Sequence, residues 1–218
     1  MKRRLELLWR FAIVDWFVPH AHTPSEVSRI VRALASRRGK GEWVIEAGCW
    51  RGGSTAKFSL ACALLGYRLA IYDSFQGVEP IGTEGGVYDF SDQYQATEEL
   101  VRGHVSRYGI IKVCEFHPGW FAHTLRPEKA PRPIRLVYID CDLAKGTREV
   151  LDGVAGNLTN DALIFSQDYH IPAVRRLLDD RSIRRSLGID STDPVVVAGH
   201  TAIMALSGAS TTLNRSRD

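Results

Sequence analysis

The sequence lacks an uninterrupted apolar run long enough to span a bilayer, so we expect no transmembrane segment. The nearest candidate, Leu5–Val18, follows a short basic stretch and superficially resembles a secretion signal. Charged residues at Glu6, Arg10 and Asp15 interrupt this stretch, and no small-residue cleavage site follows it. The sequence therefore predicts no signal peptide.

Two other features are missing. There is no long run of Lys or Arg, and the net charge is only +3, so we expect no nucleic-acid partner. No cysteine belongs to a Cys-x-x-Cys pair or to a small disulfide scaffold; the cysteines are Cys49, Cys62, Cys114 and Cys141. We expect these thiols to be reduced and buried, which favours a cytoplasmic location.

The composition is typical of one soluble globular domain. The 218 residues, of which 44% are hydrophobic and 24% charged, suffice for one packed domain and are few for two. Near the N-terminus, apolar residues recur at helical spacing from Leu5 to Trp16 and predict an amphipathic helix. We expect residues 1–40 to form helices that cap the domain or contact a second subunit of a homo-oligomer. Loose association with a membrane surface is the alternative.

From residue 43 onward, short apolar runs alternate with helical patterns. Strands are predicted at Trp43–Ala47, Tyr67–Tyr72, Ile110–Phe116, Ile134–Ile139 and Ala162–Ser166, helices at Ser54–Leu65, Thr147–Leu158 and from Pro172, and a hairpin at Val195–Ala198 and Thr201–Leu206. This order predicts a single Rossmann-like α/β domain over residues 41–206. Its sheet should be mainly parallel, with helices on both faces and a closing hairpin that adds an antiparallel strand at one edge. Residues 207–218 are expected to be a disordered tail, and the glycine-rich stretch Gln76–Gln95 a lid over the site.

A glycine-rich turn follows the first predicted strand. Its spacing, Gly-x-x-x-Gly-Gly, differs from the Gly-x-Gly-x-x-Gly of dinucleotide-binding proteins, which holds a pyrophosphate. The turn suits a ligand without phosphate at this point, such as the methionine part of S-adenosylmethionine, whose amino group Glu46 could hold. Asp73 ends the next strand, where a carboxylate typically receives the ribose hydroxyls of an adenosine cofactor. The predicted cofactor-binding residues are Glu46, Gly48, Trp50, Gly52, Ser54, Asp73, Ser74 and Asp140.

Five segments together resemble the macrocin O-methyltransferase family: Glu46–Ser54, Tyr72–Val78, Gly119–Leu125, Tyr138–Leu143 and Gln167–Tyr169. The resemblance covers roughly Glu42 to Asp180, and the motifs are specific in combination and order. It implies a class I methyltransferase fold and a divalent metal ion near the acceptor oxygen. The family commonly has two adjacent acids where this chain has Gln167 followed by Asp168, so a neutral amide that contributes no charge to the metal replaces one carboxylate.

The predicted acceptor site is acidic. Asp140, Asp142 and Asp168 lie at or just past the ends of two strands that are usually neighbours, and converging carboxylates suit Mg²⁺. By resemblance these three residues are metal ligands or base, and we expect Asp142 to take the proton of a hydroxyl that metal coordination has acidified. His170 is the rival base, and His117 and His200 also lie near strand ends. Trp120, Phe121 and Tyr169 are candidates for an apolar wall beside the acceptor.

These patterns predict an S-adenosylmethionine-dependent O-methyltransferase that acts on a small molecule, and the resemblance implies that the acceptor is a hydroxyl of a sugar or glycosylated natural product. A catechol-type enzyme that methylates a phenolic hydroxyl is the rival within the same class. A non-catalytic subunit that binds the cofactor and regulates a partner is the rival from another class. An NAD-dependent oxidoreductase is disfavoured by the glycine spacing.

Overall fold

The computed structural model describes residues 2–37, 41–80, 89–91, 93–189 and 191–206. The expected disordered tail (207–218) and most of the centre of the expected lid (81–88 and 92) lie outside these ranges. The helices are α1 (Lys2–Phe17), α2 (Pro24–Ala35), α3 (Gly53–Leu65), α4 (Glu98–Tyr108), α5 (Phe121–Thr124), α6 (Ala144–Val154), α7 (Pro172–Asp179) and α8 (Arg181–Ser186), with 3₁₀ turns η1 (Ile111–Val113), η2 (Ala155–Asn157) and η3 (Gln167–His170). The strands are β1 (Trp43–Ala47), β2 (Arg68–Asp73), β3 (Cys114–Pro118), β4 (Ile134–Ile139), β5 (Leu158–Ser166), β6 (Val195–Ala198) and β7 (Thr201–Ala205).

The strands form one seven-stranded sheet in the order β3-β2-β1-β4-β5-β7-β6. The first five are parallel neighbours, and β7 pairs antiparallel with both β5 and β6. The predicted α/β fold with a closing hairpin is therefore confirmed. In this hairpin, β7 lies one place inside the edge and β6 forms the edge.

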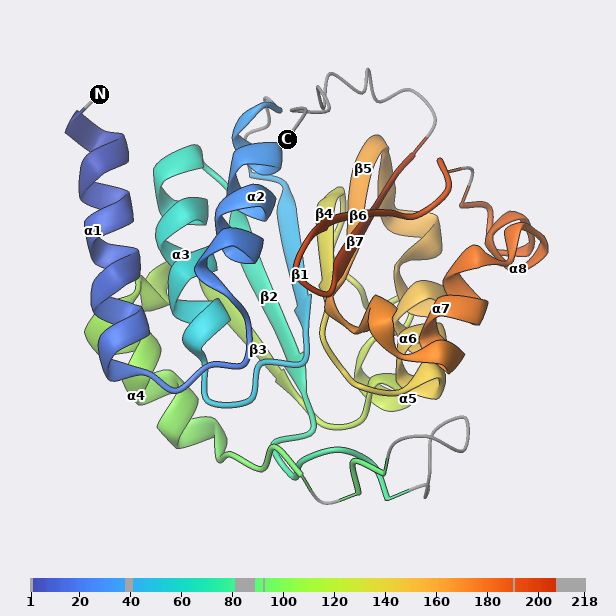
Figure 1. Ribbon diagram of the computed structural model, residues 1–218, viewed down its shortest axis with the longest axis horizontal. Coiled ribbons are helices and arrows are strands. Elements are labelled where there is room, and N and C mark those ends of the chain that lie inside the picture. Colours follow the sequence, from blue (N-terminus) through green and yellow to red (C-terminus); the bar gives the residue numbers. More distant parts are fainter. Residues whose placement is uncertain (1, 38–40, 81–88, 92, 190, 207–218) are drawn as a thin grey trace.

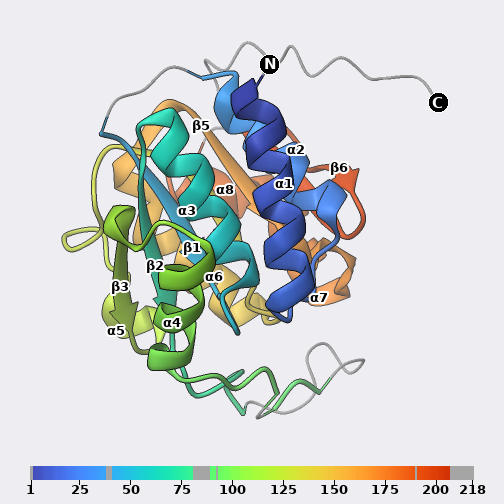
Figure 2. The same cartoon turned by 90° about the vertical axis from the view of Figure 1, so that its left-hand side faces the viewer.

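Helices cover both faces of the sheet, as Figure 1 shows. Side chains alternate along each strand, so Val44 belongs to one hydrophobic cluster and Ile45 to the other. The first cluster lies under α1, α2, α3 and α4, and the second lies under α6 and α7. Figure 2, turned by 90°, shows α1 and α3 on the same face. Because both faces are buried, the central strands are mostly apolar, with Glu46 of β1 and Arg135 of β4 as buried exceptions.

Two predicted strand boundaries were wrong because contacts with distant segments decide where these strands begin. Ile111–Val113 is a 3₁₀ turn, because the chain after α4 first packs on α3, where the Ile110 N–H donates to Ser59 Oγ at 2.9 Å. The third strand therefore begins only at Cys114. The helix predicted at Thr147–Leu158 is α6, and β5 begins earlier than expected because Leu158 pairs with Ile134 of β4.

The N-terminal helices share the core of the sheet. Phe11 and Val14 of α1, and Val18 just after it, are buried in the same cluster as Val44. Helix α2 begins with a capping box, since Thr23 accepts from the Glu26 N–H and the Glu26 side chain accepts from the Thr23 N–H. No helix in the described ranges is long and apolar enough to cross a membrane.

Candidate functional site

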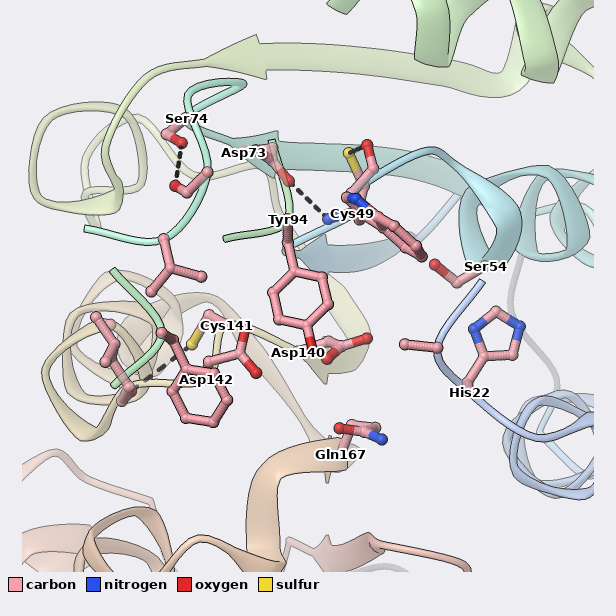
Figure 3. Close-up of a pocket in the computed structure, with 18 of the residues that line it drawn as sticks. His22, Cys49, Ser54, Asp73, Ser74, Tyr94, Asp140, Cys141, Asp142 and Gln167 are labelled. Carbon is pink, nitrogen blue, oxygen red and sulfur yellow. Dashed lines mark hydrogen bonds between the residues drawn. The ribbon is translucent and has the colours of Figure 1, made fainter. Parts of the chain in front are cut away.

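A pocket of about 330 Å³ opens where the parallel strands end. Gly48 after β1, Asp73 at the end of β2, Asp140 after β4 and Gln167 after β5 all line it. Figure 3 shows these segments converging around the cavity. Parts of the chain outside the sheet complete the wall: the α1–α2 connection (residues 18–23), the described ends of the 76–95 loop, and the hairpin residue His200. The pocket lies at the carboxyl ends of the strands, where open α/β sheets bind ligands.

The glycine turn after β1 is held between two strands. The Gly48 N–H donates to the Tyr72 carbonyl of β2 at 2.9 Å, and the Asp140 N–H donates to the Ala47 carbonyl at 2.9 Å. Gly48 has a φ of +89°, and a Cβ there would lie 1.7 Å from the Asp140 carbonyl oxygen. Only glycine fits this position, and its role is to bring β1 and β4 together beneath the ligand.

The Asp73 carboxylate, at the end of β2, accepts hydrogen bonds from two backbone N–H groups. Its Oδ2 accepts from the Cys49 N–H at 2.7 Å, and its Oδ1 accepts from the Phe75 N–H at 2.7 Å. Next to it, the Ser74 hydroxyl donates to the Gly77 carbonyl at 2.9 Å. Asp73 and Ser74 both line the pocket, and each Asp73 oxygen keeps a second lone pair that could accept from a ligand hydroxyl.

Glu46 and Gly52 do not line the pocket, although both were predicted to contact the cofactor. Glu46 is fully buried and accepts a hydrogen bond from the Ser54 hydroxyl, so Ser54 stands between it and the cavity. Burial raises the pKa of Glu46 to about 8. Gly52 is the N-cap of α3 with a φ of +82°, and a Cβ there would meet Val101 of α4 at 2.9 Å. Gly52 therefore shapes the turn without facing the ligand.

The three acids after β4 and β5 lie close enough to disturb one another's ionisation. Burial and the charges of Asp168 and Asp142 raise the pKa of Asp140 well above its usual value. Burial and Asp168 raise the pKa of Asp142 to about 8, and burial raises the pKa of Asp168 to about 6. Asp142 also has a φ of +64°, a conformation that a non-glycine residue adopts at a cost and that is often found at functional sites.

The three predicted metal ligands lie together, but they are not a ready-made ligand set. Asp140 and Asp142 line the pocket, whereas Asp168 is fully buried, and its Oδ2 accepts from the N–H groups of Cys141 and Asp142 at 2.8 and 2.9 Å. Asp168 thus holds the loop that presents Asp142. Across the part of the chain that the structure describes, no group of three or more His, Cys, Asp or Glu side chains is arranged to hold a metal ion. Asp168 Oδ1 is nevertheless buried without a hydrogen-bond partner, so Asp140, Asp142 and Asp168 as ligands of Mg²⁺ stay a prediction.

The histidines divide into two groups. His170 and His200 line the pocket and make an edge-to-face ring contact, with centroids 4.1 Å apart. Burial, and then the neighbouring His200, lower the pKa of His170, so it is neutral at neutral pH. His117 instead stacks on Tyr72 and does not line the pocket.

Aromatic side chains form part of the wall. Trp120 and Phe121 line the pocket, as predicted, whereas Tyr169 is buried in the core and donates to Asp179 at 2.6 Å. Sequence reasoning missed Tyr94, whose ring meets the Trp50 ring edge-on with centroids 5.5 Å apart. Tyr94 belongs to the expected lid, Gln76–Gln95. The glycine-rich composition of that stretch predicted a loop over the site but did not indicate which of its residues would face the pocket.

His22, just before α2, is another pocket residue that sequence reasoning missed. The capping box at Thr23 and Glu26 marks where α2 begins. Nothing local indicates that this helix start lies over the glycine turn, because that position depends on contacts between distant segments.

The sheet order and the pocket at its carboxyl edge define the class I methyltransferase fold. The solved structure of the O-methyltransferase NovP superposes with a TM-score of 0.70 at 21% identity, covering 86% of this chain and 83% of that one. The calicheamicin methyltransferase CalS11 superposes with a TM-score of 0.60 at 14% identity, covering 94% and 93%. At these identities the likeness shows the fold alone.

Sequence comparison defines the family. The macrocin-O-methyltransferase (TylF) family model matches residues 26–197, and the chain belongs to this family. A relative from Streptomyces olivaceus, 8-demethyl-8-(2,3-dimethoxy-alpha-L-rhamnosyl)-tetracenomycin-C 4'-O-methyltransferase, is 28% identical over 163 residues. The match covers 70% of this chain and 60% of the relative, so the chain spans about three fifths of the length of that protein.

Proposed function

We propose that this chain transfers a methyl group from S-adenosylmethionine to a hydroxyl group of a sugar or glycosylated natural product. One observation carries the proposal: a single pocket joins the glycine turn after β1, Asp73 at the end of β2 and the acidic segment after β4. Family membership supports methyl transfer to oxygen, and the Streptomyces olivaceus relative is named for methylating a rhamnosyl group.

The pocket residues suit the two parts of the cofactor. Ser54 and the amino end of α3 suit the charged amino-acid arm, and Asp73 suits the ribose hydroxyls. Bound there, S-adenosylmethionine supplies an electrophilic methyl group on a sulfonium centre. Gly48 and Trp50 would lie beneath and beside it, at the turn between these two polar ends.

Asp142 is the proposed general base. Its carboxylate takes the proton of the acceptor hydroxyl as the oxygen–carbon bond forms and the sulfur–carbon bond breaks, which leaves S-adenosylhomocysteine. Trp120 and Phe121 would flank the acceptor and hold its oxygen in line with the methyl group. Asp140 and Asp142, with Asp168 behind them, are the residues that would hold Mg²⁺, which would lower the pKa of the acceptor hydroxyl; no step of the proposed mechanism has the ion as a reactant.

The test begins with calorimetric titration of the purified protein with S-adenosylmethionine and S-adenosylhomocysteine. Binding should then be followed by mass spectrometry of products formed from rhamnosylated polyketides and, in parallel, from catechols. Methylation of a sugar hydroxyl is the expected outcome. Methylation of catechols alone would favour the phenolic rival, and cofactor binding without any turnover would favour the regulatory subunit. Absence of binding would remove the proposal.

The Asp142→Asn variant tests the base. We expect turnover to fall by about 10²- to 10⁴-fold, because the amide cannot accept the proton, while S-adenosylhomocysteine still binds. His170→Ala is the matched comparison, since His170 lines the same pocket. A larger loss of turnover in His170→Ala than in Asp142→Asn would indicate that His170, rather than Asp142, is the general base.

Metal removal tests the predicted Mg²⁺ ligands. We expect dialysis against EDTA to lower turnover, and Mg²⁺ but not Na⁺ to restore it, because a divalent cation would offset the mutual repulsion of Asp140, Asp142 and Asp168. Turnover that is unchanged by chelation would contradict the predicted ligand set. Asp140, Asp142 and Gln167 are the pocket-lining residues to mutate next.

The proposal includes a homo-oligomer formed through α1. Leu5, Leu8, Trp9 and Trp16 lie on one exposed stripe of that helix, and a second copy is the partner that we expect to cover it. We also expect a cytoplasmic location, with which four free thiols agree.

A further inference from the structure

A buried lysine lies behind the pocket and joins three segments. Lys57 of α3 is 1% exposed, and its Nζ contacts Asp15 of α1 and, at 2.8 Å, the Nε2 of His22 in the α1–α2 connection. His20 completes the group, with its Nε2 3.3 Å from the same Asp15 oxygen. The proposed chemistry of methyl transfer uses none of these side chains.

The contact between Lys57 and His22 assigns the proton on the imidazole. A lysine ammonium donates hydrogen bonds and has no lone pair, so His22 Nε2 is the acceptor and the proton of the neutral ring is on Nδ1. Burial, and then the charge of Lys57, lower the pKa of His22 to about 2, so the ring stays neutral. His22 is thereby held as a hydrogen-bond donor through Nδ1.

His22 lies at the same end of the pocket as Ser54. Both side chains line the cavity, and Figure 3 shows them together near the start of α3. The connection before α2 packs tightly on the first turn of that helix, since a Cβ on Gly53 would lie 2.8 Å from His20 Cβ and 3.1 Å from the Pro19 carbonyl oxygen. The His22 imidazole and the free N–H groups at the amino end of the 13-residue helix α3 therefore lie at the same end of the pocket.

We propose that His22, oriented by Lys57, donates a hydrogen bond to the carboxylate of the methionine arm of S-adenosylmethionine. This inference rests on the proposed function. A donor cannot satisfy the ammonium of that arm, and the positive end of α3 favours an anion. The buried Lys57 ammonium adds positive charge behind the imidazole. Asp15, its anionic partner, is bonded to Lys57 and His20 and does not line the pocket.

The test compares ligands that differ only in the arm. S-adenosylhomocysteine carries the carboxylate, decarboxylated S-adenosylhomocysteine lacks only that group, and 5'-methylthioadenosine lacks the whole amino-acid arm. In calorimetric titrations we expect the His22→Ala variant to bind S-adenosylhomocysteine about tenfold or more weakly than wild type, as for loss of a hydrogen bond to a charged group. Affinity for the other two ligands should not change.

Three further variants separate positioning from folding. His22→Asn keeps an N–H near the place of Nδ1 and should restore much of the affinity for S-adenosylhomocysteine. Lys57→Met removes the group that orients His22 and should lower the affinity for S-adenosylhomocysteine selectively. Unchanged binding of 5'-methylthioadenosine to this variant is the check that the pocket is intact. His123→Ala, on an exposed histidine away from the pocket, is the matched control and should bind like wild type.

Two results for the His22→Ala variant would overturn the inference alone: an equal loss of affinity for all three ligands, or an unchanged affinity for S-adenosylhomocysteine. Failure of the wild-type protein to bind S-adenosylhomocysteine would instead overturn the proposed function, and this inference with it. The two failures are therefore distinguished by the wild-type titration.

Discussion

Four carboxyl groups at or behind the pocket, those of Glu46, Asp140, Asp142 and Asp168, retain protons at pH values where exposed acids have lost them. Glu46, Asp142 and Asp168 all have pKa values raised chiefly by burial, and Asp140 is raised further by its two acidic neighbours. Two opposite consequences follow at the scale of single residues. A base in this group becomes competent only as pH rises, whereas a structural acid makes the fold less stable as pH rises.

The first consequence concerns the rate. The pKa of Asp142 is about 8, so the fraction present as carboxylate increases through that pH. We expect kcat/KM, which reports the free enzyme, to rise between pH 6 and pH 9 with a midpoint near 8. Because Asp140 and Asp168 titrate together with Asp142, the midpoint belongs to the group. A profile that is flat over this range, measured with both substrates, would contradict the assignment of Asp142 as base.

The second consequence concerns stability. Unfolded Glu46 loses its proton near pH 4.5 and the folded residue near pH 8, so between these values the folded state binds the extra proton. The stabilising effect of that proton is complete below pH 4.5 and is lost as pH rises to about 8. Glu46→Gln cannot ionise, so its melting temperature should decrease less than that of wild type from pH 5 to pH 9. Parallel melting curves for the two proteins would show that Glu46 is not the group responsible.

At the scale of elements, α1 has two apolar faces and only one of them is covered. Phe11 and Val14 lie in the core, whereas Trp9 is 69% and Trp16 83% exposed. An exposed apolar stripe of this kind on a helix commonly marks an interaction surface. The helical periodicity of the sequence revealed the amphipathic pattern but could not show which face meets the sheet, because both faces carry large apolar residues.

We expect the double variant Trp9→Glu/Trp16→Glu to be monomeric in sedimentation velocity while wild type is oligomeric. Burying charge at such an interface is costly, and both positions point away from the core. Leu100→Glu is the control, since Leu100 is an exposed apolar residue on α4. A monomeric wild type would refute the prediction, and wild-type binding to lipid vesicles that the variant loses would favour the membrane alternative.

At the scale of the whole molecule, the parallel sheet could be predicted because its strands are short apolar runs in a regular alternation with helices. Residues at strand ends, such as Asp73 and Asp140, were placed correctly for the same reason: their positions follow from local pattern and from the common edge of a parallel sheet. His22 and Tyr94 could not be predicted, since long-range contacts bring their segments to the pocket. The burial of Asp168 and Glu46 was also beyond local pattern, because it depends on neighbouring strands.

One carboxylate couples the beginning of the chain to its end. Glu26 caps α2 and also accepts from the His200 N–H at 3.1 Å and the Thr201 hydroxyl at 2.9 Å, 174 and 175 residues away. Glu26 and His200 both line the pocket. During synthesis on the ribosome, the cavity wall thus stays unfinished until the β6–β7 hairpin has left the exit tunnel. A nascent chain arrested before that hairpin should carry the glycine turn and yet have an open, incomplete pocket.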